Sequence, residues 1–140
     1  MKEVDVKKIM EQIQRENAGR SDDEIWRPVN QYLKERIERC AGADKIVVFG
    51  AGNFGQRVLD ILKEQNIDSV VCFCDNNPEN WGKTREKLKI RSALEACIKY
   101  PNALYLITPK RGEYTIAMQL MNIGIVQENL LQFRPDYCER

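Results

Sequence analysis

The stretch that decides the fold reads KIVVFGAGNFGQRVLDIL at residues 45–62, and SVVCFCD follows it at residues 69–75. Residues 46–49 form a continuous apolar run that is mostly β-branched, which predicts a short buried strand over 45–49. After a glycine-rich turn, apolar residues over 53–65 recur at helical spacing and predict an amphipathic helix. The second apolar run, 69–74, predicts another buried strand that ends at Asp75. This order of elements is typical of a parallel sheet covered by helices.

The same alternation continues towards the end of the chain. Further strands are predicted at 88–90, 103–108 and 129–133, and helices at 92–99 and 112–123. Ser92 can cap the first of these helices, and Gly124 can end the second. We therefore predict an α/β fold over residues 45–140, a small Rossmann-like parallel sheet with helices on both faces.

Residues 1–44 are predicted to form a separate helical extension. Apolar residues over 6–13 follow helical spacing, and Ser21 with Glu24 fits a capping box that begins a second helical stretch. Pro28 lies inside that stretch, so it either kinks the helix or marks the first turn of another one. The extension can cap the core, form a homodimer, or dock a larger protein.

The three glycines of the turn, Gly50, Gly52 and Gly55, fit the pattern G-x-G-x-x-G. The first permits the tight strand-to-helix turn, the second lets the backbone approach a pyrophosphate, and the third lets helix and strand pack closely. The N–H groups of the new helix would then face the phosphate. Because the motif follows a predicted strand and opens a predicted helix, it indicates a nucleotide site. The alternative is that these glycines serve packing alone.

Asp75 supplies the acidic residue that such a site requires. It follows Gly50 by roughly 25 residues, close to the usual spacing of about 20. A carboxylate there accepts ribose hydroxyls and disfavours a 2′-phosphate, so NAD is preferred over NADP. CoA, a nucleotide sugar and S-adenosylmethionine remain alternatives. Asp75 can instead simply begin the polar turn that follows it.

The segments VVFGAGNFGQRVLDIL and VVCFCDNNPENWG resemble the small Rossmann-like domains of bacterial nucleoside-diphosphate-sugar epimerases and dehydratases and of polysaccharide-biosynthesis proteins. The resemblance implies that the three glycines form the phosphate loop and that Asn53 and Phe54 donate backbone N–H groups to it. It also implies that Asp75 contacts the ribose, Asn76 lies beside the base or ribose, and Thr108 lines the other side of the crevice.

The chain departs from those enzymes in its catalytic residues. No tyrosine is followed by a lysine four positions later, which the short-chain epimerases and dehydratases need. The short core also suggests one mononucleotide-binding half rather than a full doubly wound sheet. We therefore predict a nucleotide-binding module that is not a complete enzyme alone, with unknown catalytic residues. The alternatives are an epimerase-type enzyme completed by a partner chain and a non-catalytic interaction or regulatory domain.

The charge balance and the cysteine and histidine counts bear on which ligands and partners the chain can bind. The 140 residues hold 22 Lys and Arg against 21 Asp and Glu, so charge favours neither nucleic acid nor an anionic membrane as a partner. There are five cysteines and no histidine, so no metal site or disulfide framework is expected. Cys72 and Cys74 should share one buried strand face.

Without a secretory signal or a long apolar span, a cytoplasmic location is the simplest expectation. Trp81 can stack on a base or anchor its turn.

Overall fold

The structure is a computed structural model that describes residues 22–109 and 111–134, with only the backbone described over 22–30. Its helices are α2 (Asp22–Ala41), α3 (Asn53–Glu64), α4 (Ala93–Lys99) and α5 (Glu113–Ile123), with 3₁₀ turns η1 (Pro78–Asn80) and η2 (Gln127–Asn129). Its strands are β1 (Ile46–Phe49), β2 (Val70–Cys74), β3 (Thr84–Arg85), β4 (Leu88–Arg91), β5 (Leu104–Ile107) and β6 (Leu130–Gln132). Among the described helices, none is long and apolar enough to cross a membrane.

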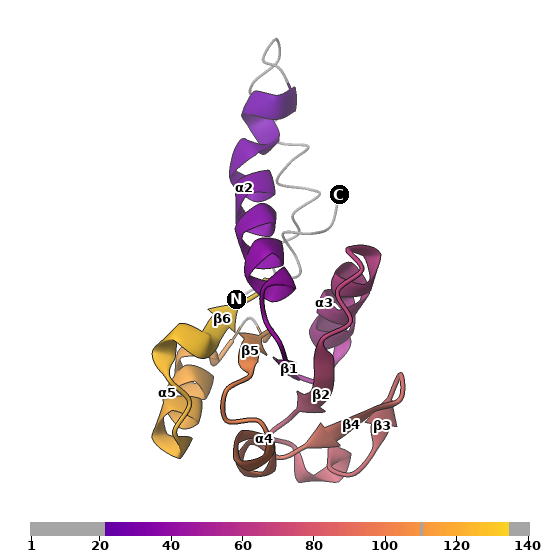
Figure 1. The fold of residues 1–140 in the computed structure, drawn as a ribbon, viewed down its shortest axis with the longest axis vertical. Helices are drawn as coiled ribbons and strands as arrows, with labels where there is room; N and C mark the ends of the chain where they lie inside the picture. The colour runs from indigo at the N-terminus through magenta and orange to yellow at the C-terminus, as the bar shows by residue number, and fades with distance from the viewer. Residues whose placement is uncertain (1–21, 110, 135–140) are drawn as a thin grey trace.

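The strands form one 6-stranded sheet in the order β3-β4-β2-β1-β5-β6 (Figure 1). All neighbouring strands are parallel except β3, which runs antiparallel to β4 at the edge. The first strand is therefore central, with the next strands on one side and the later strands on the other, as in doubly wound nucleotide-binding sheets. The predicted Rossmann-like fold is confirmed. The suggestion of a single mononucleotide-binding half is wrong, because β5 and β6 extend the sheet past β1.

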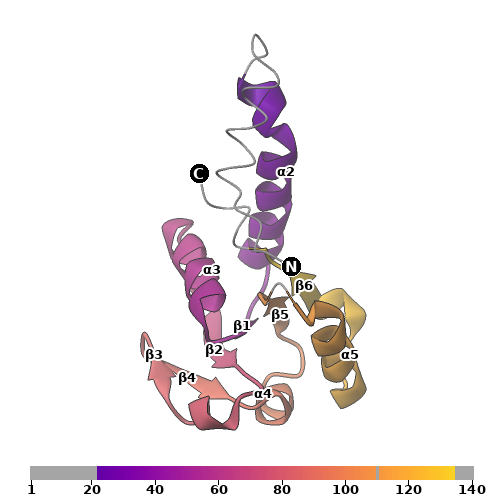
Figure 2. The ribbon, with the colours of Figure 1, turned by 180° about the vertical axis from the view of Figure 1, so that it is seen from behind.

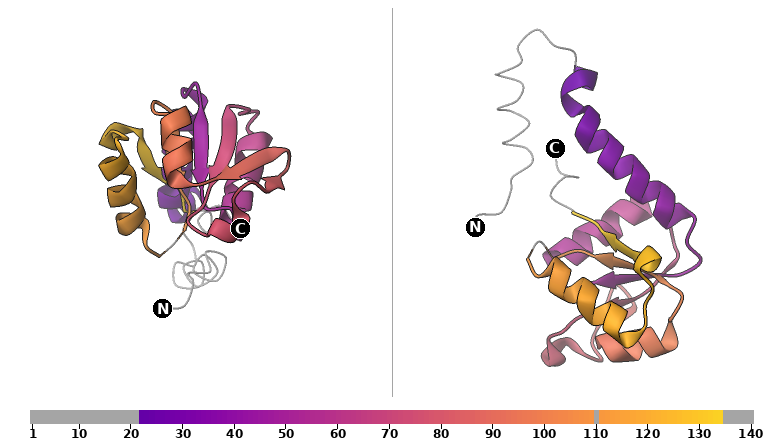
Figure 3. Two further views of the ribbon diagram at one scale, coloured as in Figure 1. Left: turned by 90° about the horizontal axis from the view of Figure 1, so that it is seen from below. Right: turned by 90° about the vertical axis from the view of Figure 1, so that its left-hand side faces the viewer.

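The two faces of the sheet bury different side chains of the same strands. In β1, Ile46 and Val48 pack with α2 and α3, whereas Val47 and Phe49 pack with α4 and α5. Successive strand residues point to opposite faces, so a strand covered on both faces must be apolar throughout. Figure 3 shows the sheet between α3 on one side and α4 with α5 on the other. The apolar runs in the sequence are therefore continuous because helices cover both faces of the sheet.

A β-hairpin at the sheet edge is the main difference from the predicted elements. The sequence predicts a strand only at 88–90, but β3 precedes it and is joined to β4 by Glu86 and Lys87. Both turn residues have positive φ, 50° at Glu86 and 69° at Lys87. Two-residue hairpin turns of this kind usually carry Asn-Gly or Asp-Gly. The pair Glu-Lys gives no such signal, so the hairpin is not predictable from turn residues.

Helix α2 rises from the sheet domain and extends well beyond it (Figures 1 and 2). It continues through Pro28, which lies inside the helix and not in a first turn. Its last turns pack on the core, where Cys40 is fully buried, and Arg36 Nε donates to the Gln132 carbonyl at 3.0 Å. The predicted stripe at 6–13 and the Ser21 cap lie outside the described residues.

Candidate functional site

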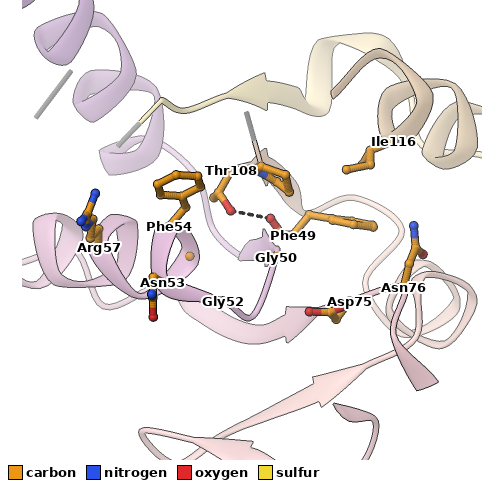
Figure 4. Close-up of a pocket in the computed structure, with 12 residues that line it drawn as sticks. Phe49, Gly50, Gly52, Asn53, Phe54, Arg57, Asp75, Asn76, Thr108 and Ile116 are labelled. Carbon is orange, nitrogen blue, oxygen red and sulfur yellow. Dashed lines mark hydrogen bonds between the residues drawn. The ribbon is translucent and has the colours of Figure 1, made fainter. Parts of the chain in front are cut away.

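A cleft of about 500 Å³ lies at the carboxyl ends of β1, β2 and β5 (Figure 4). Open α/β sheets bind ligands in this crevice, where the strand order reverses. The structure brings all the predicted site residues together around it: Gly50, Gly52, Asn53, Phe54, Gly55, Asp75, Asn76 and Thr108. Their shared location is a finding, whereas their roles in binding remain predictions.

Gly50 is required by the fold itself. Its φ of +109° lies in the region that side chains disfavour, and an added Cβ would lie 2.5 Å from Thr108 Oγ1. That hydroxyl is buried and donates to the Phe49 carbonyl at 2.8 Å. Gly50 N–H in turn donates to the Cys74 carbonyl at 2.7 Å. The end of β1 is thus tied to both of its neighbouring strands.

Gly55 and Gly52 differ in what they do for the fold. A Cβ at Gly55 would lie 1.8 Å from the Gly50 carbonyl oxygen, so close helix–strand packing excludes any side chain there. A Cβ at Gly52 would meet nothing within 4 Å, and its φ of −85° suits any residue. Packing therefore explains Gly50 and Gly55, as the packing alternative predicts, but it does not explain Gly52.

The amino terminus of α3 lines the cleft, through Gly52, Asn53, Phe54 and Gly55. The first helical bond runs from Gln56 N–H to the Gly52 carbonyl at 3.1 Å, and no side chain caps the turn before it. The first turn of α3 carries no acidic residue of its own. Two cations lie close by. Arg57 lines the cleft, and Arg85 Nη1 donates to the Gly52 carbonyl at 3.0 Å.

Asp75 is bound to the protein through both of its carboxylate oxygens. Oδ2 accepts the Ala51 N–H at 3.1 Å, which ties the glycine loop to β2. Oδ1 accepts the Asn77 N–H at 2.8 Å, which begins the polar turn. The turn-forming alternative for Asp75 is therefore confirmed. A carboxylate has about four acceptor positions, so two intramolecular bonds leave capacity for ribose hydroxyls.

Trp81 anchors the turn after β2. Its Nε1 donates to the Asp75 carbonyl at 2.7 Å, and the residue is 43% exposed. Trp81 does not line the cleft, so the structure favours the anchoring interpretation over base stacking.

Sequence reasoning missed four residues that line the cleft: Phe49, Arg57, Pro109 and Ile116. Arg57 follows Asn53 by one helical turn, so helix geometry alone indicates that both belong to one side of α3. Ile116 belongs to the core cluster under α4 and α5, where it is 8% exposed, and it also contributes to the cleft wall.

The cysteines of β2 belong to the core and not to the cleft. Cys72 and Cys74 are fully buried in the cluster under α4 and α5, so the predicted shared face is confirmed. Burial raises the pKa of the Cys72 thiol to about 11 and raises the pKa of Cys74 further. Both side chains are thus protonated thiols near neutral pH.

The cleft is lined by few ionisable side chains. Among the described residues that line it, the only ionisable side chains are Asp75 and Arg57. Asp75 is engaged by two backbone N–H groups, and the Thr108 hydroxyl donates to a carbonyl. N–H groups, a cation and a carboxylate together suit a phosphate next to a ribose.

Comparisons with known proteins agree with the fold. The family model C2185-like, N-terminal matches residues 42–131. UDP-D-quinovosamine 4-dehydrogenase from Vibrio fischeri is similar at a TM-score of 0.52 and 20% identity, over 64% of this chain and 77% of that chain. RSP, a Rex-family repressor, is similar at a TM-score of 0.50 and 14% identity, over 95% of this chain and 75% of that chain. No curated protein matches significantly.

RSP has also been solved in complex with β-NAD+ and operator DNA, and that structure matches at a TM-score of 0.48 and 16% identity, over 95% of this chain and 75% of that chain. At these identities the similarity shows the fold alone. The comparisons give no support to the prediction, made from charge, that nucleic acid is not a partner.

Proposed function

The chain belongs to the C2185-like, N-terminal family, and from the geometry of its cleft we propose that it is a binding module for a nucleotide diphosphate, with NAD(H) as the first candidate and a nucleotide sugar as the second. In this proposal the diphosphate lies against the glycine loop and the first turn of α3. The ribose lies beside Asp75, and Thr108 and Pro109 form the opposite wall.

The observation that carries the proposal is the open space at Gly52. The fold needs no glycine there, because a Cβ would touch nothing and φ is ordinary. A ligand that approaches the backbone closely does need one. Gly52 also forms the N-cap of a helix whose first turn carries no side-chain cap, which is the usual setting for a bound phosphate.

Asp75 supports NAD(H) over NADP(H) in this proposal. Its carboxylate retains acceptor positions for two ribose hydroxyls, and its negative charge would repel a 2′-phosphate. Because its oxygens also hold the Ala51 and Asn77 N–H groups, the side chain is fixed in place. A fixed acceptor loses little conformational freedom when a ligand binds.

Binding without complete catalysis agrees with the residues that line the cleft, and we propose a role in bacterial sugar or polysaccharide metabolism. The sequence resemblance to nucleoside-diphosphate-sugar proteins supports this role. A dehydrogenase that acts on a UDP-sugar shares the fold, which adds support at the level of fold only.

We further propose that residues 1–44 form an extension to a binding domain at 45–140 and that the extension docks a second copy of the chain or a larger polysaccharide-synthesis enzyme. The part of α2 that projects past the sheet domain supports this division (Figure 1). Among the α2 residues whose side chains the structure describes, 31–41, the core contacts come from Leu33, Ile37 and Cys40.

A binding panel tests the proposal. Thermal unfolding should be followed with NAD, NADP, CoA, S-adenosylmethionine and UDP-sugars, and calorimetry should confirm any shift. A ligand at about 100 times its dissociation constant stabilises the protein by about 2.7 kcal/mol, a shift of several degrees. We expect NAD or a UDP-sugar to give this shift and NADP to give less. If no nucleotide shifts the transition or releases heat, the proposal is wrong.

A further inference from the structure

A reciprocal pair of amides joins the two sides of the cleft at one end. Asn76 Nδ2 donates to Gln119 Oε1 at 2.9 Å, and Gln119 Nε2 donates to Asn76 Oδ1 at 2.9 Å. Asn76 lies in the loop after β2 and lines the cleft, whereas Gln119 lies on α5, one turn after the cleft residue Ile116. Figure 4 shows Asn76 pointing towards the side of the cleft that Ile116 forms. The pair therefore connects the β2 loop with α5 beside the cleft.

The hydrogen-bonding edge that Gln119 presents to Asn76 has the chemistry of an adenine edge. In this pair each amide uses one N–H donor and its carbonyl acceptor, side by side on one edge. The N6 amine and N7 of adenine offer the same adjacent donor and acceptor, and asparagine binds them in the same bidentate way. Asn76 directly follows Asp75, the proposed ribose residue. Its amide is therefore placed where a base attached to that ribose would lie.

We propose that the Asn76 amide reads the adenine base of the bound nucleotide and that Gln119 takes the place of the base edge in the nucleotide-free protein. This inference rests on the proposed function and deepens it by assigning the residue that selects the base. Asn76 is the reading residue because it lines the cleft. Gln119 is the internal competitor because it lies outside the cleft on a helix. The apolar side chain of Ile116 provides a surface beside the base.

The proposal gives the two halves of one hydrogen-bonded pair opposite effects on binding. A nucleotide must displace Gln119 before its base reaches Asn76, so removing the Gln119 amide should tighten binding. Removing the Asn76 amide also breaks the pair, but it deletes the group that recognises the base. A pair that only holds the loop to α5 would respond alike to either change.

The test compares ADP with purine riboside 5′-diphosphate, which has the same diphosphate, ribose and ring but lacks the N6 amine. Calorimetry should be done on the full chain and on Asn76→Leu, Gln119→Leu and the control Asn122→Leu, which removes an exposed amide one turn further along α5. For the parent protein we expect ADP to bind roughly tenfold tighter than the analogue. Gln119→Leu should bind ADP several-fold tighter and keep the preference. Asn76→Leu should lose the preference, and Asn122→Leu should match the parent protein.

Three results would overturn the inference. If the parent protein binds ADP and the analogue equally, no residue reads the amine, while the proposed nucleotide site still stands. If Asn76→Leu and Gln119→Leu change ADP affinity in the same direction and keep the same preference, the pair has only a structural role. If the parent protein binds neither diphosphate nor any other nucleotide of the panel, the proposed function fails and the inference fails with it. Circular dichroism of each variant checks that the fold is retained.

Discussion

Replacing Gly52 with alanine separates ligand binding from fold stability, because the fold has no use for the missing side chain at this position. The new methyl group would meet no atom within 4 Å, and φ at −85° is ordinary for alanine. Alanine is a poorer N-cap than glycine by about 0.5–1 kcal/mol. It also lowers the entropy of the unfolded chain, which is worth about 0.4–1 kcal/mol in the other direction. The free energy of unfolding should therefore change by less than about 1 kcal/mol.

The effect of Gly52→Ala on binding should be much larger. The methyl group would occupy the space through which a phosphate approaches the backbone N–H groups. A hydrogen bond to a charged group contributes about 1.5–3 kcal/mol, so losing one weakens binding roughly 10- to 150-fold. At a ligand concentration that stabilises the parent protein by about 2.7 kcal/mol, a variant that binds 100-fold more weakly gains only about 0.4 kcal/mol.

The assay is thermal unfolding with and without the ligand found in the binding panel, followed by calorimetry. Gly55→Ala is the contrasting variant. Its Cβ would lie 1.8 Å from the Gly50 carbonyl oxygen, so it should lower stability by about 1–3 kcal/mol or more even without ligand. If Gly52→Ala binds the ligand as tightly as the parent protein, no phosphate approaches the backbone at Gly52 and the reasoning is refuted.

Three further predictions concern stability and are checked by urea unfolding. Asp75→Ala should lower stability by about 1–3 kcal/mol without any ligand, because two backbone N–H groups lose their carboxylate acceptor, and an unchanged midpoint would contradict this. Lys87→Gly should raise stability by about 0.5–1 kcal/mol by relieving its φ of 69°, whereas the control Lys89→Gly, in β4, should lower it. Burial raises the pKa of the Cys40 thiol to about 12, so its contribution to stability is complete below about pH 8.5 and should be lost as the pH rises towards 12. A Cys40→Ala variant should show a shallower alkaline decline, and equal slopes would count against buried thiols as its cause.

The structural role of the Asp75 carboxylate affects how its proposed contact with the ribose can be tested. Loss of binding in Asp75→Ala would not by itself show a ribose contact, because the same carboxylate holds the Ala51 N–H in the glycine loop. Gly52→Ala leaves that bond intact, so it is the cleaner test of the site. The two variants together distinguish a lost ligand contact from a loosened loop.

Most of the fold follows from local pattern. The runs before Gly50 and before Asp75 are apolar because β1 and β2 are covered on both faces, and each observed strand except β3 lies within its predicted range or within one residue of it. The edge strand β3 was missed because it is only two residues long and its turn, at Glu86, lacks glycine and asparagine. Short edge strands depend on pairing with a neighbour more than on their own residues.

The sequence by itself determined the sheet class, the elements other than β3, and eight of the residues that surround the cleft, because apolar periodicity and glycine spacing act over a few neighbouring positions. Only the tertiary structure decided what those residues do for one another. It showed that packing explains Gly55 and not Gly52, and that the Asp75 carboxylate holds the glycine loop. It also paired Asn76 with Gln119, 43 residues away in the chain. Such contacts depend on how helices and strands pack together, which local sequence patterns do not predict.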